Sequence, residues 1–425
     1  MTSTPGPGPE PTSGPGPEIQ GPGFTPGPGI DDLAKATERL RQHPLDQGVW
    51  LDVAALLGVH GTSDDAEAAF ATIGEGARLG GQVVLAVACG RHLTQLGSMR
   101  GTELIDQVIE TYATGGPHFA FEAPSVPEDP PIVPVVDGSV VEQARDLVHK
   151  LATWLVARRI AKVPPAPLLS ALSKPGARAL VGVMTARAIP AGTVIIEIGE
   201  PASALYWLAH GTVAIARDGA ELGELHTGAF FGEIALVGGV KRTARVTARD
   251  DVWLLEIPAR AIETAATKHP KLAEVLAHHA RARLLANLTK TSELFRSLDD
   301  EDREVLLSKF TTQLVPEGTT FISEGVANEH LWVVVSGRCE VRSAGAALSE
   351  LGPGAAVGEI SLVSGATAVA DVVAIEPAVL LRLSKQDFAA IAKKHPKLLE
   401  EVEKLVVARE TANRAVFQDA SDLIV

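Results

Sequence analysis

The chain has 425 residues, of which 46% are hydrophobic and only 4% aromatic, and its formal net charge at pH 7 is −14. This length suits about two to four domains, whose cores must consist mainly of Ala, Val, Leu and Ile. The negative net charge argues against nucleic acid and anionic membranes as partners, because both need a basic face on the protein.

Neither the cysteines nor the hydropathy points to an extracellular or membrane protein. Cys89 and Cys339 lie far apart and outside any C-x-x-C spacing, which predicts buried apolar residues in a reducing cytoplasm. No apolar run approaches the ~18 residues that span a bilayer. The N-terminus also lacks a basic patch followed by an apolar stretch, so we expect no secretory signal and a cytoplasmic chain.

The first third of the chain begins with a tail and continues with helices. Residues 1–29 are almost a Pro-Gly repeat, which predicts a disordered tail. Helical spacing of apolar residues follows over residues 30–114. Trp50 in one helix, and Ala66 and Phe70 in the next, resemble a tetratricopeptide-type repeat of about 34 residues. An unrelated helical bundle is the alternative, and either would offer a face to a protein partner.

Residues 115–165 are predicted to form a Pro- and Gly-rich linker and then an amphipathic helix from about Val141 to Lys162. The tetrad at 158–161, Arg-Arg-Ile-Ala, superficially resembles the pseudosubstrate motif of protein kinase A regulatory subunits. Lys162 follows it, however, where a large apolar residue would be expected. A basic last turn is also what the helix dipole favours, so we interpret the tetrad as the end of the helix.

After residue 165 the pattern changes to short strands. Val194–Ile198 and Val213–Ala216 end at turns, and Asp218-Gly219 is a strong signal for a two-residue hairpin. Many short strands between turns predict a small antiparallel barrel or jelly roll. A helical tail from Ala259 to about Leu288 would complete this unit, which we place at residues 166–290.

A polar motif lies late in this unit. The residues FGEIAL at 231–236 are followed, after four residues, by KRTA at 241–244. Gly232 has no Cβ and lets a ligand approach the backbone, and the turn after it would present free N–H groups to an anion. Arg242 adds a forked, permanently charged donor suited to two phosphate oxygens. Glu233 then needs a donor of its own, such as a sugar hydroxyl.

This motif resembles the phosphate-binding cassette of cyclic nucleotide-binding domains. The resemblance implies that Glu233 accepts the ribose 2′-OH and that Arg242 neutralises the cyclic phosphate. It also implies that the backbone at Gly232, Ile234 and Ala235 completes the cradle. The alternative without a ligand is a surface ion pair between Glu233 and Arg242 on a barrel.

Other residues bear on which nucleotide would bind. A hydroxyl at the position of Thr243 contacts guanine in some members of the family, but it also occurs in domains that prefer adenine. We therefore expect cAMP or cGMP as the ligand, with no cofactor and no metal. Arg281 and Arg283 lie on the helix that closes over the base in the family, although a solvated helix face is the simpler interpretation for both.

The whole unit repeats after 126 residues without a gap, which places a second domain at 291–415 and a tail at 416–425. The residues that recur in register are Pro190, Gly192, Gly199, Gly211, Gly228, Gly232, Glu233 and Leu236, which return as Pro316, Gly318, Gly325, Gly337, Gly354, Gly358, Glu359 and Leu362. Matching glycines indicate matching backbone conformations, so both copies should share one fold.

The second copy lacks the cation of the motif. Ala368 stands where the first copy has Arg242, while Glu359 is retained. Losing one partner of a buried charged contact costs about 2–5 kcal/mol, so we expect at least a ~30-fold weaker site for a cyclic nucleotide. Phe231 and Thr243 are also replaced, by Val357 and Val369.

The sequence thus predicts an α+β multidomain protein: an N-terminal helical, repeat-like region followed by two antiparallel β-barrel or jelly-roll cyclic nucleotide-binding domains with flanking helices. The predicted function is a non-enzymatic sensor that relays binding in the first domain to an unidentified protein partner through the helical region. A structural scaffold is the alternative. A transcription factor is excluded, because too few residues remain after Arg414 for a winged helix. No catalytic constellation points to an enzyme.

Overall fold

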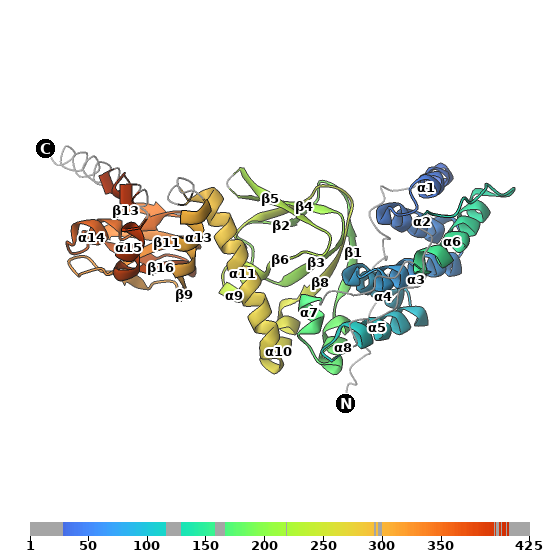
Figure 1. Cartoon of the computed structure of the whole chain (residues 1–425), viewed down its shortest axis with the longest axis horizontal. Coiled ribbons are helices and arrows are strands. Elements are labelled where there is room, and N and C mark those ends of the chain that lie inside the picture. Colours follow the sequence, from blue (N-terminus) through green and yellow to red (C-terminus); the bar gives the residue numbers. More distant parts are fainter. Residues whose placement is uncertain are drawn as a thin grey trace, which may run out of the picture.

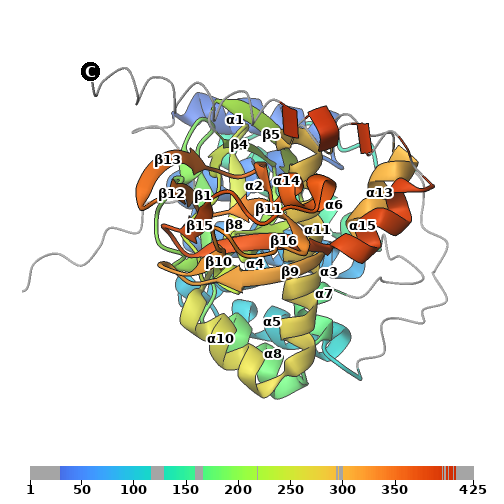
Figure 2. The same ribbon diagram turned by 90° about the vertical axis from the view of Figure 1, so that its left-hand side faces the viewer.

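The structure is a computed structural model that describes residues 29–115, 129–157, 166–217, 219–292, 295, 300–394, 396, 399–400, 402–404 and 406–407. Three units follow one another along the long axis of the molecule: stacked helices, a first β domain and a second β domain (Figure 1). Figure 2 views the molecule from the end formed by the second β domain. The predicted tails and the tetrad at 158–161 lie outside the described residues.

The N-terminal unit is built of helices that pack on their neighbours in sequence, as expected. Its helices are α1 (Ile30–Gln42), α2 (Gln47–His60), α3 (Ser63–Leu79), α4 (Val83–Gln95), α5 (Met99–Tyr112) and α6 (Val140–Ala157). The side chain of Asp46 caps α2, and that of Thr62 caps α3, by accepting backbone N–H bonds. Helix α6 returns to pack on α3 and α1. A helical region is therefore present, and its tetratricopeptide-like character stays a prediction.

Two stretches near the first β domain differ from the expectation. Residues 166–182, expected to begin the strands, form the short helices α7 (Pro167–Ser170) and α8 (Lys174–Gly182), and Ser173 caps α8. The helical tail is broken in two, α10 (Ala259–Lys268) and α11 (Pro270–Thr291). Pro270 has no N–H to continue the first helix, but it fits the first turn of a new one.

The first β domain is a sandwich of two antiparallel sheets with strand orders β1-β8-β3-β6 and β2-β7-β4-β5. Its elements are β1 (Thr185–Ile189), β2 (Val194–Ile196), β3 (Ala204–His210), β4 (Thr212–Arg217), β5 (Ala220–His226), β6 (Phe230–Phe231), α9 (Glu233–Gly238), β7 (Arg245–Ala248) and β8 (Val252–Pro258). Arg217 pairs with Ala220 across the predicted hairpin.

The second β domain repeats this topology strand for strand, with orders β9-β16-β11-β14 and β10-β15-β12-β13. Its elements are α13 (Asp300–Lys309), β9 (Thr311–Val315), β10 (Thr320–Ile322), β11 (His330–Ser336), β12 (Cys339–Ser343), β13 (Ala346–Leu351), β14 (Ala356–Val357), α14 (Glu359–Ser364), β15 (Asp371–Ala374), β16 (Ala378–Ser384) and α15 (Lys385–Ala392). Gly232 and Gly358 have φ angles of 89° and 86°, which confirms the repeat at the level of the backbone.

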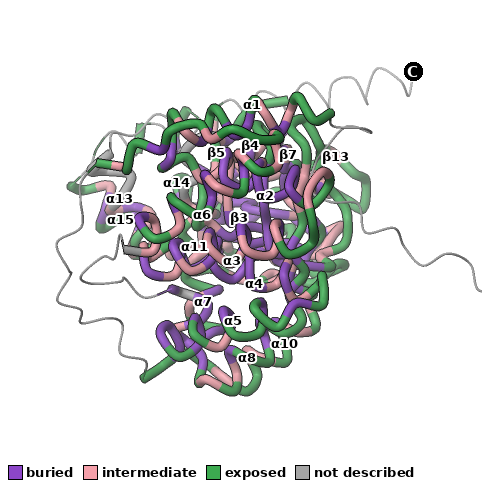
Figure 3. The backbone as a smooth tube through the Cα atoms, turned by 90° about the vertical axis from the view of Figure 1, so that its right-hand side faces the viewer, coloured by how far each residue is buried: buried purple, intermediate pink, exposed green. Residues whose placement is uncertain are grey.

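Each sandwich buries the same sheet against the unit that precedes it. Helix α4 packs on β1, β3 and β8, and the ring of Trp253 lies 5.4 Å from Phe70 and 5.3 Å from His92. The buried core is therefore continuous from the helices into the first sandwich. Viewed along the long axis, buried positions gather at the centre of the molecule and exposed positions at its edge (Figure 3). In the second domain, β11 and β16 share a core with residues of α9 and α11, among them Ala235 and Leu288.

Both cysteines are buried and unbridged, as expected, and burial raises the pKa of the Cys339 thiol to about 11. Among the described helices, none combines the length and the apolar character that a membrane crossing requires.

Candidate functional site

A left-handed glycine turn organises the motif of the first β domain. Gly232 follows β6 and forms the N-terminal cap of α9, with φ 89° and ψ 0°. A Cβ at this position would lie 2.6 Å from Nη1 of Arg242 and 3.3 Å from the carbonyl oxygen of Ala204. Glycine is therefore required twice, for the positive φ and for the close approach of the guanidinium.

Arg242 is buried, with 5% of its surface exposed. Its Nη1 donates to the carbonyl of Gly232 at 3.0 Å, and its Nη2 donates to the carbonyl of Ala204 at 2.6 Å. The guanidinium also lies 5.9 Å from the centre of the Tyr206 ring. Burial lowers the pKa of Arg242, and the nearby Tyr206, Glu200 and Glu233 partly offset this effect. A guanidinium carries five N–H groups, so three remain beyond these two bonds.

Glu233 is fully buried at the first position of α9. Nη1 of Arg283 lies 3.1 Å from its Oε1 and 3.2 Å from its Oε2, but only the contact with Oε2 has hydrogen-bond geometry. Burial raises the pKa of Glu233, and Arg283 and Arg242 partly offset this effect. Among the residues that the structure describes, Oε1 is thus a buried acceptor that lies next to a cation and has no hydrogen-bond partner.

The other residues of the motif face the second β domain. The side chains of Ile234 and Ala235 pack against its core, and a Cβ on Gly238 would lie 3.0 Å from Cγ2 of Val379. Thr243 is partly buried, and its carbonyl accepts a 2.6 Å bond from Nε of Arg217. The motif therefore lies at an interface between domains, which its spacing in sequence did not predict.

Neither arginine of α11 is simply solvated. Arg283 pairs with Glu233 and lies 6.0 Å from the centre of the Phe230 ring. Arg281 donates from Nη2 to the carbonyl of Phe310 at 2.8 Å and from Nη1 to Oγ1 of Thr312 at 2.7 Å. The simpler interpretation of a solvated helix face is therefore wrong for both, because one binds the motif and the other binds the second domain.

A cavity of about 280 Å3 adjoins the motif between the two β domains. Four cationic residues line it, together with one carboxylate: Arg217, Lys241, Arg242, Arg338 and Glu376. In a chain of net charge −14, this group makes a local positive region beside Arg242. Among the described residues, no group of three or more His, Cys, Asp or Glu side chains could hold a metal ion.

In the second domain, a neutral side chain donates to the backbone carbonyls at the glycine turn. Nδ2 of Asn328 donates to the carbonyl of His330 at 2.7 Å and lies 3.3 Å from that of Gly358, to which it also donates. With the shift of 126 residues, these two carbonyls correspond to those of Ala204 and Gly232. Asn328 itself corresponds to Ala202. The donor that Ala368 cannot provide thus comes from a residue 40 positions earlier, outside the motif.

Comparison with known proteins agrees with this architecture. A family model described as cyclic nucleotide-binding domain matches residues 186–269 and 312–395. These two segments are tandem domains of that kind, and they resemble the domains of regulatory subunits of cAMP-dependent protein kinase.

Individual relatives extend this similarity. The regulatory subunit of cAMP-dependent protein kinase of Candida albicans is 25% identical over 215 residues, 50% of this chain and 44% of that protein. A cyclic nucleotide-gated potassium channel of Mesorhizobium japonicum is 35% identical over 113 residues, 27% of this chain and 31% of the channel. The match therefore spans less than half the length of either protein.

Among solved structures, the cAMP-bound regulatory domain of Toxoplasma gondii protein kinase A is 20% identical. The match covers 57% of this chain and 92% of that one, with a TM-score of 0.27.

Proposed function

We propose that this chain is a non-enzymatic sensor of cAMP or cGMP, in which the first β domain binds the nucleotide and the second does not. One observation carries the proposal. At a single glycine turn, a buried guanidinium has three N–H groups beyond its bonds to two backbone carbonyls, and a buried carboxylate oxygen has no hydrogen-bond partner among the residues that the structure describes. A cyclic phosphate with an adjacent ribose hydroxyl would complement both groups.

In this proposal Arg242 holds the phosphate and Oε1 of Glu233 accepts the ribose hydroxyl. The backbone N–H groups of Gly232, Ile234 and Ala235, at the first turn of α9, would face the anion. Thr243 follows Arg242 in the sequence. Charged hydrogen bonds gain strength where water is excluded. The cationic residues beside Arg242 would supply the local field that the acidic chain as a whole lacks.

The relay that we propose runs through two contacts of the same site. Helix α9 shares a core with the second β domain, so a shift of the motif on binding would press on β16. Glu233 pairs with Arg283 on α11, and Arg281 on that helix holds β9. A ligand can shift this arrangement only if it binds one conformation more tightly than the other. The helical region would pass the change to a protein partner.

Calorimetry with cAMP and with cGMP tests the binding site. Compared with the wild type, Arg242→Ala should bind at least ~30-fold more weakly. Arg249→Ala is the matched control, because Arg249 is an exposed arginine of the same domain that pairs with Glu221 and Glu224. It should bind as the wild type does. Equal heats from the wild type and Arg242→Ala would refute the site.

A structural scaffold is the second candidate, and one observation favours it. Arg242 bonds two backbone carbonyls of its own domain, so its burial has a role in the fold that needs no nucleotide. The two functions differ in the behaviour of the wild type. Absence of heat with either nucleotide at millimolar concentration would favour the scaffold.

A further inference from the structure

The cavity of about 280 Å3 between the two β domains extends beyond the motif of the first domain. Of the described residues that we propose to hold a cyclic nucleotide, only Arg242 and Thr243 line it. A single water needs about 10–15 Å3 of such space, so the cavity has room for a small molecule. Its walls come from both domains, which means that a ligand in it would contact both.

The first β domain supplies three of the four cationic residues that line the cavity. Arg217 and Arg242 are buried, and Nε of Arg217 donates to the carbonyl of Thr243 at 2.6 Å. The ammonium group of Lys241 takes part in no ion pair or hydrogen bond within the described part of the chain. The N–H of Gly199 donates to the carbonyl of Arg242 at 2.9 Å. This wall is therefore positively charged and is held in place by hydrogen bonds to the backbone.

The second β domain supplies the other wall, which includes Arg338, Ser336 and Glu376. Arg338 pairs with Glu350, but both side chains are more than half exposed, and such surface pairs contribute little. The N–H of Glu376 donates to the carbonyl of Arg338 at 3.3 Å, which joins the two turns of this wall. Ser336 is 1% exposed, and its Oγ has no hydrogen-bond partner among the described residues. This wall thus adds a fourth cation and a hydroxyl that can donate to an anion.

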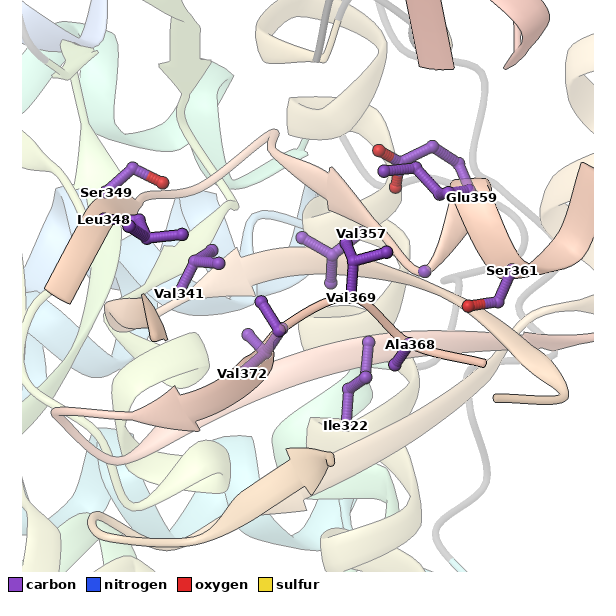
Figure 4. Close-up of a pocket in the computed structure, with 13 residues that line it drawn as sticks. Ile322, Val341, Leu348, Ser349, Val357, Glu359, Ser361, Ala368, Val369 and Val372 are labelled. Carbon is purple, nitrogen blue, oxygen red and sulfur yellow. The ribbon is translucent and has the colours of Figure 1, made fainter. Parts of the chain in front are cut away.

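The two copies of the fold show that these cations are particular to the junction between the domains. The shift of 126 residues aligns each of them with a neutral residue of the other copy. Arg217, Lys241, Arg242 and Arg338 correspond in this way to Ser343, Thr367, Ala368 and Thr212. Figure 4 shows Ala368 beside the cavity at the counterpart of the motif, which no Lys or Arg of the described residues lines. The repeat therefore carries cations at these positions where its two copies meet, and neutral residues at the equivalent positions elsewhere.

We propose that the cavity at the junction binds a diphosphate group, either as the free anion or as part of a nucleoside diphosphate. The lining residues have a formal excess of three positive charges. One phosphate group carries about −1.5 to −2 at pH 7, so two phosphate groups match that excess better than one does. Arginine is also the side chain best suited to paired phosphate oxygens. This site goes beyond the proposed function and does not depend on it, because diphosphate would need neither the glycine turn nor Glu233.

Calorimetry of the full chain with inorganic diphosphate, in the absence of a cyclic nucleotide, tests this proposal. Inorganic diphosphate should bind at least ~10-fold more tightly than inorganic phosphate, because it can contact cations of both domains. Lys241→Ala and Arg338→Ala should each weaken its binding ~10-fold, and both residues are exposed, so neither change should prevent folding. ADP distinguishes the two sources of the group. Tighter binding of ADP than of inorganic diphosphate would indicate a nucleotide, and the reverse would indicate the free anion.

Arg338→Ala is the decisive variant, because Arg338 lies outside the domain that carries the motif. Arg342→Ala is its matched control, since Arg342 also pairs with a glutamate of the second domain and does not line the cavity. It should bind inorganic diphosphate as the wild type does. Equal losses in the two variants would reveal a general effect of charge and overturn the proposal.

Two other results would also overturn it: undiminished binding of inorganic diphosphate to Arg338→Ala, and no heat from inorganic diphosphate or ADP at millimolar concentration. Failure of the wild type to bind cAMP and cGMP would instead overturn the proposed function of the first domain and leave the result with diphosphate unchanged.

Discussion

Arg242 in the first β domain and Asn328 in the second donate to equivalent backbone carbonyls. We therefore expect that the contribution of Arg242 to stability can be separated from its contribution to ligand binding. Arg242→Ala removes the donor of two buried carbonyls, those of Gly232 and Ala204. Ala202→Asn adds to that variant the amide that the second domain uses at the equivalent position. Ala202 is partly buried, as Asn328 is, so the new side chain begins from a comparable environment.

The size of the effect follows from the two hydrogen bonds. A buried polar group without a partner costs about 1–3 kcal/mol. Part of the loss in Arg242→Ala is offset, because a charge no longer has to be buried, so we expect a net loss of about 1–3 kcal/mol. The Asn328 amide lies 2.7 Å and 3.3 Å from its two carbonyls. One good and one long bond should recover about half of that loss.

Urea denaturation and calorimetry measure the two quantities separately. Arg242→Ala should unfold at a urea concentration lower by roughly 0.5–1 M and should bind a cyclic nucleotide at least ~30-fold more weakly. The double variant with Ala202→Asn should regain part of the urea midpoint and bind as weakly as Arg242→Ala does. An unchanged midpoint in the double variant would refute the idea that both domains satisfy the same pair of carbonyls. Restored binding would refute the assignment of the phosphate to Arg242.

Three further predictions concern neighbouring residues. Gly232→Ala should destabilise the chain by about 1–3 kcal/mol more than Gly239→Ala, because both have positive φ but only the former places its Cβ against Arg242; equal urea midpoints would contradict this. Arg283→Ala should raise the pKa of the buried motif carboxylate further, because its main compensating cation is lost. A carboxyl titration unchanged by this substitution, followed by NMR, would count against the pairing. Burial lowers the pKa of His92 to about 4, so the unfolded chain binds more protons below pH 6.5 and stability falls with acidification. That loss, about 2 kcal/mol between pH 7 and 5, should vanish in His92→Leu, and equal pH dependence of the melting temperatures would exclude it.

His92 is buried because rings from another helix and from the first β domain pack against it. Its ring lies 4.5 Å from that of Phe70 on α3 and 5.3 Å from that of Trp253 on β8. Acidification would charge a group between the helical region and the first β domain, so this interface should loosen first. The sequence placed Phe70 on a helix of the repeat-like region, but it did not predict that Trp253 of β8 packs against that ring.

The sequence predicted those features that depend on local pattern or on exact register. The spacing of apolar residues predicted helices over residues 30–114, where the structure has α1 to α5. The shift of 126 residues predicted that the two β domains share a fold, because the same glycine positions require the same positive φ. It also predicted the loss of the cation at Ala368. In these cases the physical cause lies within a few residues of the position concerned.

Only the tertiary structure decided which groups meet. Asn328 and Arg242 donate to equivalent carbonyls from different positions in their domains. The shift of 126 residues aligns Asn328 with Ala202, but it does not show that Asn328 makes these hydrogen bonds. The pairing of Glu233 with Arg283 and the covering of the motif by the second domain likewise join elements distant in sequence. Hydrogen bonds and packing act over a few ångströms in space, so residues far apart in the chain acquire partners only when the fold brings them together.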